Sequence, residues 1–157
     1  GGRLMCWQSG PFSDRPIVLQ FHGNGEIVHD WKGDWANWVQ MQGYDIFLAE
    51  YRGYGGSEGI PRLAAMLDDV TSIVDAMGVP SSQIVVFGRS IGSLYAAEMV
   101  KRYPDARGLV IESGICDLAE RLLLRAHPAE LGCSEEELHA AVKTHFNQEQ
   151  KMAVAMG

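Results

Sequence analysis

Four short apolar segments, separated by polar and glycine-rich stretches, dominate the hydrophobic pattern of this chain. They occupy Pro16–Gly23, Tyr44–Tyr51, Gln83–Gly88 and Gly108–Gly114. Within each segment the apolar residues are nearly continuous rather than alternating with polar ones. Such continuity is typical of strands buried on both faces of a parallel sheet. We therefore predict four parallel strands, and a weaker strand at Leu4–Trp7 before them.

Between these segments, apolar side chains recur at three- and four-residue spacing, which indicates amphipathic helices. This spacing predicts helices over Val28–Gln42, over Arg62–Met77 with Pro61 at its start, and from Ser90 to about Tyr103. Strands and helices thus alternate along the chain. That order predicts the α/β class, with a mostly parallel, doubly wound sheet and helices on both of its faces.

After the fourth strand the pattern becomes helical only, with segments at Asp117–Arg125 and Ser134–Phe146. Ser134 and Glu137 have the spacing of a capping box. The apolar side of the second helix consists of Leu138, Ala141, Val142 and His145. We expect one domain over residues 1–157. Residues 115–147 would then be either a lid over a functional site or an ordinary packed helical pair.

Composition narrows the function classes. With 46% hydrophobic and 21% charged residues the chain has a globular composition. A net charge of −7 disfavours binding to nucleic acid or to an anionic membrane, and no apolar run is long enough for a membrane span. The three cysteines are widely spaced and form no metal-binding motif. We expect reduced thiols, a cytoplasmic location, and neither a metal nor an organic cofactor.

The stretch "VVFGRSIGSLYAAEMV" places a serine where an apolar strand turns directly into a helix. Gly88 and Gly92 flank Ser90, and without a Cβ they let strand and helix approach closely. A serine at such a corner projects its Oγ beyond the carboxyl end of the sheet, where open α/β sheets bind ligands. It also lies at a helix N-terminus, which favours developing negative charge. Ser90 is therefore the candidate nucleophile, although an ordinary N-cap serine is the simpler alternative.

A second motif, "FHGNGE", follows the first strong strand. Acyl transfer needs N–H donors where the carbonyl oxygen becomes an oxyanion, and a glycine-rich turn can present them. We predict that the backbone N–H groups of Asn24 and Ile91 form this oxyanion hole. Gly23 and Gly25 would shape the turn. His22 precedes the nucleophile in the chain, and we interpret it as a structural residue of the loop rather than the general base.

A third motif, "EYRGYGGSEG", is rich in glycine but lacks the dinucleotide-binding fingerprint. The GxGxxG template started at Gly53 has Glu58 at its last position, and started at Gly23 it has Val28 there. A nucleotide-binding α/β domain is therefore a weaker alternative.

The motifs "HGNGE", "YRGYGGSEG" and "GRSIGS", in this order, resemble those of the α/β-hydrolase superfamily of serine hydrolases. The resemblance covers nearly the whole chain and is greatest to a small bacterial branch with an HGN-type oxyanion loop, which comprises esterases, acyl hydrolases and peptidase-like enzymes. It implies a serine hydrolase that cleaves an ester, thioester or amide in a small-molecule acyl substrate, with Ser90 as nucleophile and with Asn24 and Ile91 as oxyanion donors. A non-catalytic binding or scaffolding protein of the same fold is the alternative.

In that superfamily an acid and then a histidine follow the nucleophile on later strands. This chain has no such strands, so the resemblance implies an incomplete α/β-hydrolase domain whose acid and histidine lie beyond Gly157. The strand at Gly108–Gly114 would then be an unprotected edge through which the chain self-associates. The alternative is a triad within the chain, formed by Ser90 with one of the later histidines and Asp117. Those histidines are His127, His139 and His145.

Overall fold

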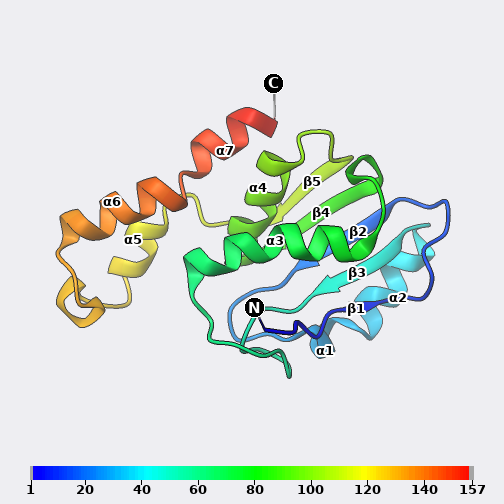
Figure 1. Cartoon of the computed structure of the whole chain (residues 1–157), viewed down its shortest axis with the longest axis horizontal. Coiled ribbons are helices and arrows are strands. Elements are labelled where there is room, and N and C mark those ends of the chain that lie inside the picture. Colours follow the sequence, from blue (N-terminus) through cyan, green and yellow to red (C-terminus); the bar gives the residue numbers. More distant parts are fainter. Residues whose placement is uncertain (1, 156–157) are drawn as a thin grey trace.

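A computed structural model describes residues 2–155 of the chain (Figure 1). Its strands are β1 (Trp7–Gln8), β2 (Ile17–Phe21), β3 (Asp45–Ala49), β4 (Ile84–Arg89) and β5 (Gly108–Glu112). Its α-helices are α1 (Val28–Trp31), α2 (Asp34–Met41), α3 (Leu63–Met77), α4 (Gly92–Arg102), α5 (Leu118–Leu123), α6 (Glu135–His145) and α7 (Gln148–Ala155). Two short 3-10 helices, η1 (Ser81–Gln83) and η2 (Pro128–Leu131), complete the elements. The predicted α/β class is confirmed.

The strands form one sheet with the order β1-β3-β2-β4-β5. β2 pairs in parallel with β3 and with β4, and β4 pairs in parallel with β5, so all four predicted strands run in one direction. Leu19 at the centre of β2 lies opposite Phe47 of β3 and Val86 of β4. The carboxyl ends of β2, β3 and β4 therefore meet at the same edge, where the three sequence motifs follow them.

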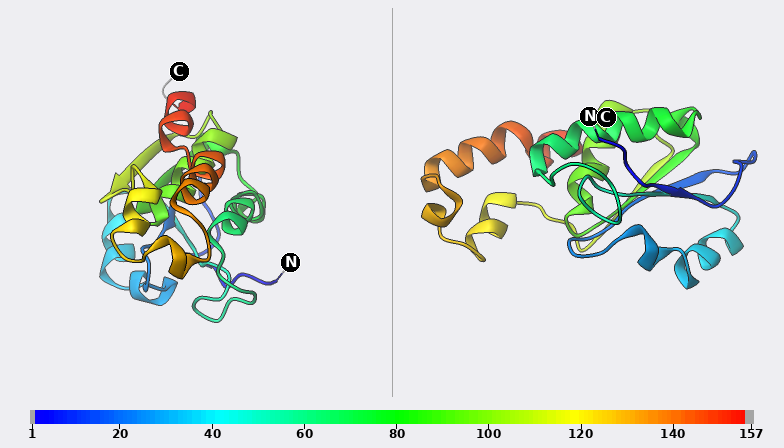
Figure 2. Two further views of the ribbon diagram at one scale, coloured as in Figure 1. Left: turned by 90° about the vertical axis from the view of Figure 1, so that its left-hand side faces the viewer. Right: turned by 60° about the horizontal axis from the view of Figure 1, so that its bottom comes forward.

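Helices cover both faces of the sheet, as the pattern predicted. The right-hand view of Figure 2 shows α3 on one side of the sheet and α1 and α2 on the other. The odd-numbered residues of β2, such as Leu19, pack with α3 and α4 in the larger core cluster. Val18 and Leu48 face the opposite way and pack against Val28 and Val39. The near-continuous apolar pattern of β2 thus reflects burial on both faces.

The first predicted helix is wrong in one respect, because Val28–Gln42 forms two helices rather than one. Lys32 ends α1, and Gly33 has non-helical backbone angles of −84° and −121° before α2 begins. Glycine loses the most conformational freedom in a helix, so the break falls there. Trp31 and Trp35 pack edge to face at 5.1 Å. Trp38 points away from the sheet and is 57% exposed.

The predicted N-terminal strand is shorter and later than expected. β1 comprises only Trp7 and Gln8 and pairs antiparallel with β3. The residues before it bond to a loop instead: the Met5 N–H donates to the Ser57 hydroxyl at 2.9 Å, and the Glu58 N–H donates to the Arg3 carbonyl at 2.9 Å. These bonds satisfy the extended backbone of the N-terminal segment away from the sheet.

The helices α5 and α6 project away from the sheet (Figure 1). Asp117 caps α5 by accepting the Glu120 N–H at 3.0 Å. The predicted capping box of α6 is confirmed, since Ser134 and Glu137 exchange bonds of 2.7 and 3.2 Å. On the predicted apolar side, Leu138 is buried but His145 is exposed. α6 ends at His145, and the next residue, Phe146, takes the buried position.

α7 returns to the body of the molecule and packs against α4 through a charged cluster. Lys151 is only 4% exposed; its Nζ lies 2.7 Å from the Glu98 carboxylate and donates to the His145 carbonyl at 2.8 Å. Arg102 donates to the other oxygen of Glu98, also at 2.7 Å. Burial would raise the pKa of Glu98, but the hydrogen bonds from Lys151 and Arg102 outweigh it and hold that pKa below its usual value.

Docking of α7 should therefore weaken in acid. Because folding lowers the pKa of Glu98 below 4.5, its contribution is fully present above that pH and is lost as the pH falls through the lowered value. We expect Glu98→Gln to lose about 2 kcal/mol of stability at pH 7 and to flatten the decline between neutral pH and pH 3. Urea unfolding of wild type and Glu98→Gln between neutral pH and pH 3 measures this difference in stability. Glu149→Gln, on the exposed side of α7, is the control and should follow wild type. An equally steep acid decline in Glu98→Gln would contradict this account.

Gln20, in the middle of β2, is fully buried, and neither polar atom of its amide has a hydrogen-bond partner among the described residues. Its neighbours across the sheet are Leu48 and Phe87. A buried amide without partners carries a desolvation cost that an apolar group of the same shape avoids.

We expect Gln20→Met, which keeps the length of the side chain, to raise the free energy of unfolding by about 1–2 kcal/mol. Urea denaturation of the two proteins measures this difference. Gln42→Met, at an exposed position after α2, serves as the control and should change little. A loss of stability in Gln20→Met would mean that a buried water satisfies the amide.

β5 forms the other edge of the sheet, and within the described residues only β4 pairs with it. Val110 and Ile111 on this strand are 45% and 40% exposed. The predicted open edge is thus present, and association of the chain through it stays a prediction. None of the helices in residues 2–155 has both the length and the apolar character needed to cross a lipid bilayer.

Candidate active site

Ser90 occupies the tight corner between β4 and α4. β4 ends at Arg89 and α4 begins at Gly92, so two residues make the whole turn. Ser90 has a φ of 51°, in the left-handed region that residues with a side chain rarely adopt. The Ser90 N–H donates to the Glu112 carbonyl at 2.9 Å. This bond to the end of β5 fixes the strained corner.

The two flanking glycines are needed because backbone atoms lie where a Cβ would be. A Cβ on Gly88 would lie 2.7 Å from the Gly92 carbonyl oxygen and 2.7 Å from the Ala96 Cβ. A Cβ on Gly92 would overlap the carbonyl of Phe21 and lie 2.8 Å from that of His22. The start of α4 therefore lies directly against the end of β2, where the HGNGE turn begins.

The Ser93 side chain stabilises the tight turn at Ser90, which is called the elbow from here on. Sequence reasoning missed this role. The Ser93 hydroxyl donates to the Ser90 carbonyl at 2.6 Å and accepts the Ile115 N–H at 3.0 Å. It thus joins the nucleophile turn to the loop after β5. A serine three residues after Ser90 was a visible signal, but nothing in the chain's pattern showed that Ile115 would lie opposite it.

The HGNGE turn presents free N–H groups beside the elbow. Gly25 has a φ of 79°, and the Glu26 N–H closes the turn on the Gly23 carbonyl at 3.4 Å. Within residues 2–155, the backbone N–H groups of Asn24 and Ile91 donate to no protein acceptor. An oxyanion hole needs unpaired N–H groups, so Asn24 and Ile91 stay the candidate donors.

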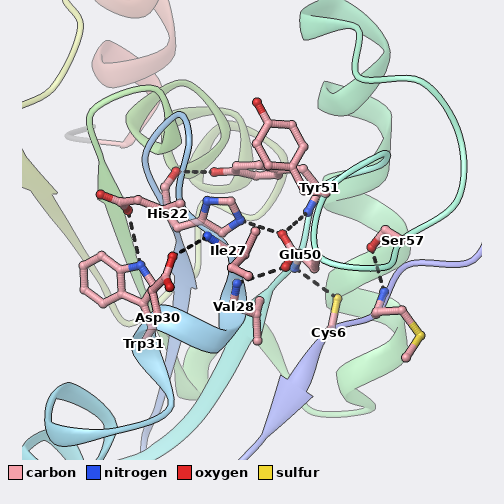
Figure 3. A network of polar contacts seen from close by, with 12 residues as sticks. Cys6, His22, Ile27, Val28, Asp30, Trp31, Glu50, Tyr51 and Ser57 are labelled. Carbon is pink, nitrogen blue, oxygen red and sulfur yellow. Dashed lines mark hydrogen bonds and ion pairs between the residues drawn. The ribbon is translucent and has the colours of Figure 1, made fainter.

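His22 lies beneath this turn and is fully buried with Glu50 (Figure 3). Its Nε2 is 2.8 Å from the Glu50 carboxylate and its Nδ1 is 2.9 Å from the Gly23 carbonyl. The Tyr51 hydroxyl donates to the His22 carbonyl at 2.7 Å, and burial raises the pKa of Tyr51 well above its usual value. Both ring nitrogens of His22 are engaged in the fold, which supports a structural role.

Glu50 is the centre of this network, and sequence reasoning assigned it no role. Besides His22, it accepts the N–H groups of Val28 at 2.9 Å and of Tyr51 at 3.1 Å (Figure 3). A buried carboxylate at the end of a strand thereby ties β3, α1 and the HGNGE turn together. Tyr54 adds a further contact, because its hydroxyl donates to the Asn24 side-chain oxygen at 2.9 Å.

No histidine in residues 2–155 forms a hydrogen bond with the Ser90 hydroxyl. His127 caps η2, accepting the Ala129 N–H at 3.3 Å. His139 lies 3.8 Å from Glu135 on its own helix, and His145 is exposed. Asp117 is engaged as the cap of α5. The structure therefore does not assemble the triad within the chain that the sequence left open.

A cavity of about 380 Å³ lies beside the nucleophile. Its wall includes Ser90, the loop after β5, and the start of α5. Ser113 in that loop also has a left-handed backbone, with a φ of 50°. Part of the 115–147 segment, for which the sequence left a lid and a packed helical pair open, thus contributes to one side of the cavity. In the part of the chain that the structure describes, no group of three or more His, Cys, Asp or Glu side chains could hold a metal ion.

A parallel sheet with helices on both faces and a strained serine elbow at its carboxyl end defines an α/β hydrolase. Comparison with known proteins agrees: residues 13–153 match the family described as serine aminopeptidase, S33. The match covers most of the chain, and the chain belongs to this α/β-hydrolase family.

Curated relatives and a solved structure are similar over most of this chain. It is 34% identical over 134 residues to the alpha/beta hydrolase domain-containing protein WAV2 of Arabidopsis thaliana, covering 78% of the chain and 43% of that protein. It is 29% identical over 137 residues to lysophosphatidylserine lipase ABHD12 of Bos taurus, covering 82% of the chain and 33% of the lipase. A crystal structure of an α/β hydrolase from Vibrio vulnificus matches 98% of the chain and 56% of its own length, with a TM-score of 0.72 and 24% identity. The chain thus spans less than half of the length of these curated relatives.

Proposed function

We propose that the protein containing this chain is a serine hydrolase that cleaves a carboxylic ester, thioester or amide through an acyl-enzyme on Ser90. The observation that carries this proposal is the strained Ser90 elbow beside two unpaired N–H groups, those of Asn24 and Ile91. The name of the bovine relative, a lysophosphatidylserine lipase, supports an ester as the substrate class.

In the proposed reaction, the Ser90 hydroxyl attacks the substrate carbonyl while a histidine outside the described residues takes its proton. The carbonyl oxygen becomes negatively charged and accepts hydrogen bonds from the Asn24 and Ile91 N–H groups. The histidine then gives the proton to the leaving group as the carbon–heteroatom bond breaks. Water, deprotonated by the same histidine, attacks the acyl-enzyme, releases the carboxylic acid and restores Ser90. A carboxylate, also outside these residues, orients the histidine.

A non-catalytic binding or scaffolding protein is the second candidate. Its support is that no histidine within residues 2–155 reaches Ser90. In this second proposal the strained turn at Ser90 has a structural role only, and the Ser90 hydroxyl takes part in no reaction.

Pre-steady-state kinetics of the full-length gene product distinguish the two. With p-nitrophenyl acetate and butyrate in excess, an acyl-enzyme mechanism with slow deacylation gives a burst of nitrophenol close to one equivalent per protein molecule. A labelled acyl group should remain on the Ser90 peptide after acid quenching. Absence of both turnover and acylation with esters, thioesters and amides would favour the non-catalytic protein. The 157-residue chain alone should be nearly inactive, because a serine without its base is a weak nucleophile.

A further inference from the structure

Glu26 and Arg89 form an ion pair that joins the two motifs on either side of the proposed oxyanion hole. The Glu26 carboxylate contacts the Arg89 guanidinium. Arg89 immediately precedes Ser90 at the end of β4, and Glu26 closes the HGNGE turn. The Arg89 side chain is 38% exposed and the Glu26 side chain 22%, so the pair is partly shielded from water. Neither residue has a place in the mechanism above.

The second oxygen of Glu26 holds the turn itself. It accepts the Gly23 N–H at 2.7 Å and the Trp31 indole N–H at 3.2 Å, the latter drawn from Trp31 in Figure 3. Gly23 permits this approach, since a Cβ there would lie 3.1 Å from the nearest oxygen of the same carboxylate. Glu26 thus fixes the His22–Gly23 peptide, which is one peptide unit before the one that carries the Asn24 N–H, a proposed oxyanion donor.

Arg89 has two further contacts on its side of the pair. Its Nε lies 3.4 Å from the Glu112 carboxylate at the end of β5, and its guanidinium lies 5.9 Å from the centre of the Trp31 ring, within reach of a cation–π contact. Glu112 also accepts the Ser90 N–H through its backbone carbonyl. Arg89 is therefore bound to Glu112, the same residue at the end of β5 that holds the Ser90 backbone. The Ile91 N–H follows Ser90 directly in the chain.

We propose that the Glu26–Arg89 pair is a positioning device that sets the separation between the Asn24 and Ile91 N–H donors. One oxygen of Glu26 holds the turn that carries Asn24, and the other holds the strand end that carries Ile91. In this proposal both side chains act through the two turns and not by contact with the substrate. This inference rests on the proposed function, because it concerns an oxyanion that forms only in the reaction. Displacing one donor by a fraction of an ångström weakens transition-state binding without changing ground-state binding.

The test is steady-state kinetics of the full-length gene product with p-nitrophenyl butyrate. Glu26→Gln and Arg89→Met should each lower kcat by about 10- to 100-fold while KM stays within about threefold. Combining the two should cost little more than either alone, since both break one contact. Arg89→Lys keeps a charge near Glu26 and should recover part of kcat. Asp69→Asn is the control. It removes one partner of another half-buried ion pair, formed with Arg52 in the loop after β3, and should leave kcat unchanged.

Three results would overturn the inference. They are an unchanged kcat in both variants, a rise in KM with kcat intact, or fully additive losses in the double variant. If a variant does not fold, Arg89→Lys and its partner Glu26→Asp give the same comparison with smaller changes. Failure of the proposed function itself would look different, because the wild-type protein would then show no turnover, or Ser90→Ala would keep the wild-type turnover.

Discussion

Replacing Ser90 with alanine is expected to lower kcat/KM of the full-length gene product for p-nitrophenyl butyrate on the order of 10⁵-fold. The physical reason is that the acyl-enzyme cannot form without the hydroxyl, so only the oxyanion donors and substrate binding would remain. The corner should survive the change, because the Ser90 backbone bond to Glu112 does not use the side chain. Circular dichroism and the urea midpoint should stay close to wild type.

Ser72→Ala is the matched control for this prediction. Ser72 is an exposed serine on α3, away from the elbow, and its loss should leave kcat/KM unchanged. Retention of more than about a tenth of wild-type activity by Ser90→Ala, with the fold intact, would assign the nucleophile to another residue and remove the basis of the proposed mechanism.

The second large effect is expected from Gly92→Ala, which should destabilise the chain by about 3 kcal/mol or more. The added methyl group would overlap the Phe21 carbonyl and lie 2.8 Å from the His22 carbonyl oxygen. Both are backbone atoms at the end of β2 and cannot move aside as a flexible side chain would. The start of α4 would have to shift away from the sheet and carry Ser90 and Ile91 with it.

Urea unfolding of the 157-residue chain measures the effect of Gly92→Ala. Gly108→Ala is the control, because a Cβ at the start of β5 would meet only Val85 at 3.8 Å, an ordinary contact. It should change the free energy of unfolding by less than about 1 kcal/mol. Equal stabilities of Gly92→Ala and Gly108→Ala would show that α4 does not lie as close to β2 as the structure has it.

The elbow could be predicted from the sequence because its signal is local. Gly88, Ser90 and Gly92 lie within five residues, between an unmistakable apolar strand and a helix of small residues. The steric need for Gly88 lies within that turn and the following helix, whereas the need for Gly92 comes from the end of β2. The central strands β2 and β3 could be predicted for a similar reason, since burial on both faces leaves a continuous apolar run. β5 has a similar apolar run but is largely exposed, because only β4 pairs with it within residues 2–155.

The polar network around the site could not be predicted, because it depends on the pairing of distant strands. Glu50 meets His22 only because β2 and β3 are neighbours in register, with Phe21 opposite Ala49. Glu26 meets Arg89 only because β2 and β4 are neighbours, with Phe21 opposite Gly88. Neither charge stands out in the sequence, where an acidic residue after a strand is most often at the surface.

The sequence prediction was wrong where the end of a helix decides which residues are buried. The apolar stripe of Val28–Gln42 has helical spacing on both sides of Gly33, and periodicity alone does not show that the helix breaks there. Likewise, His145 has the spacing of a buried position, but α6 ends at it and Phe146 packs into the core instead.

The identity of Ser90 as a reactive nucleophile is tested most directly by a fluorophosphonate probe. The full-length gene product would be incubated with the probe, digested, and analysed by mass spectrometry, with Ser90→Ala in parallel. We expect one phosphonyl adduct, on the peptide containing Ser90, and no adduct in the variant. An adduct on a different serine, or a Ser90 no more reactive than Ser72, would contradict it.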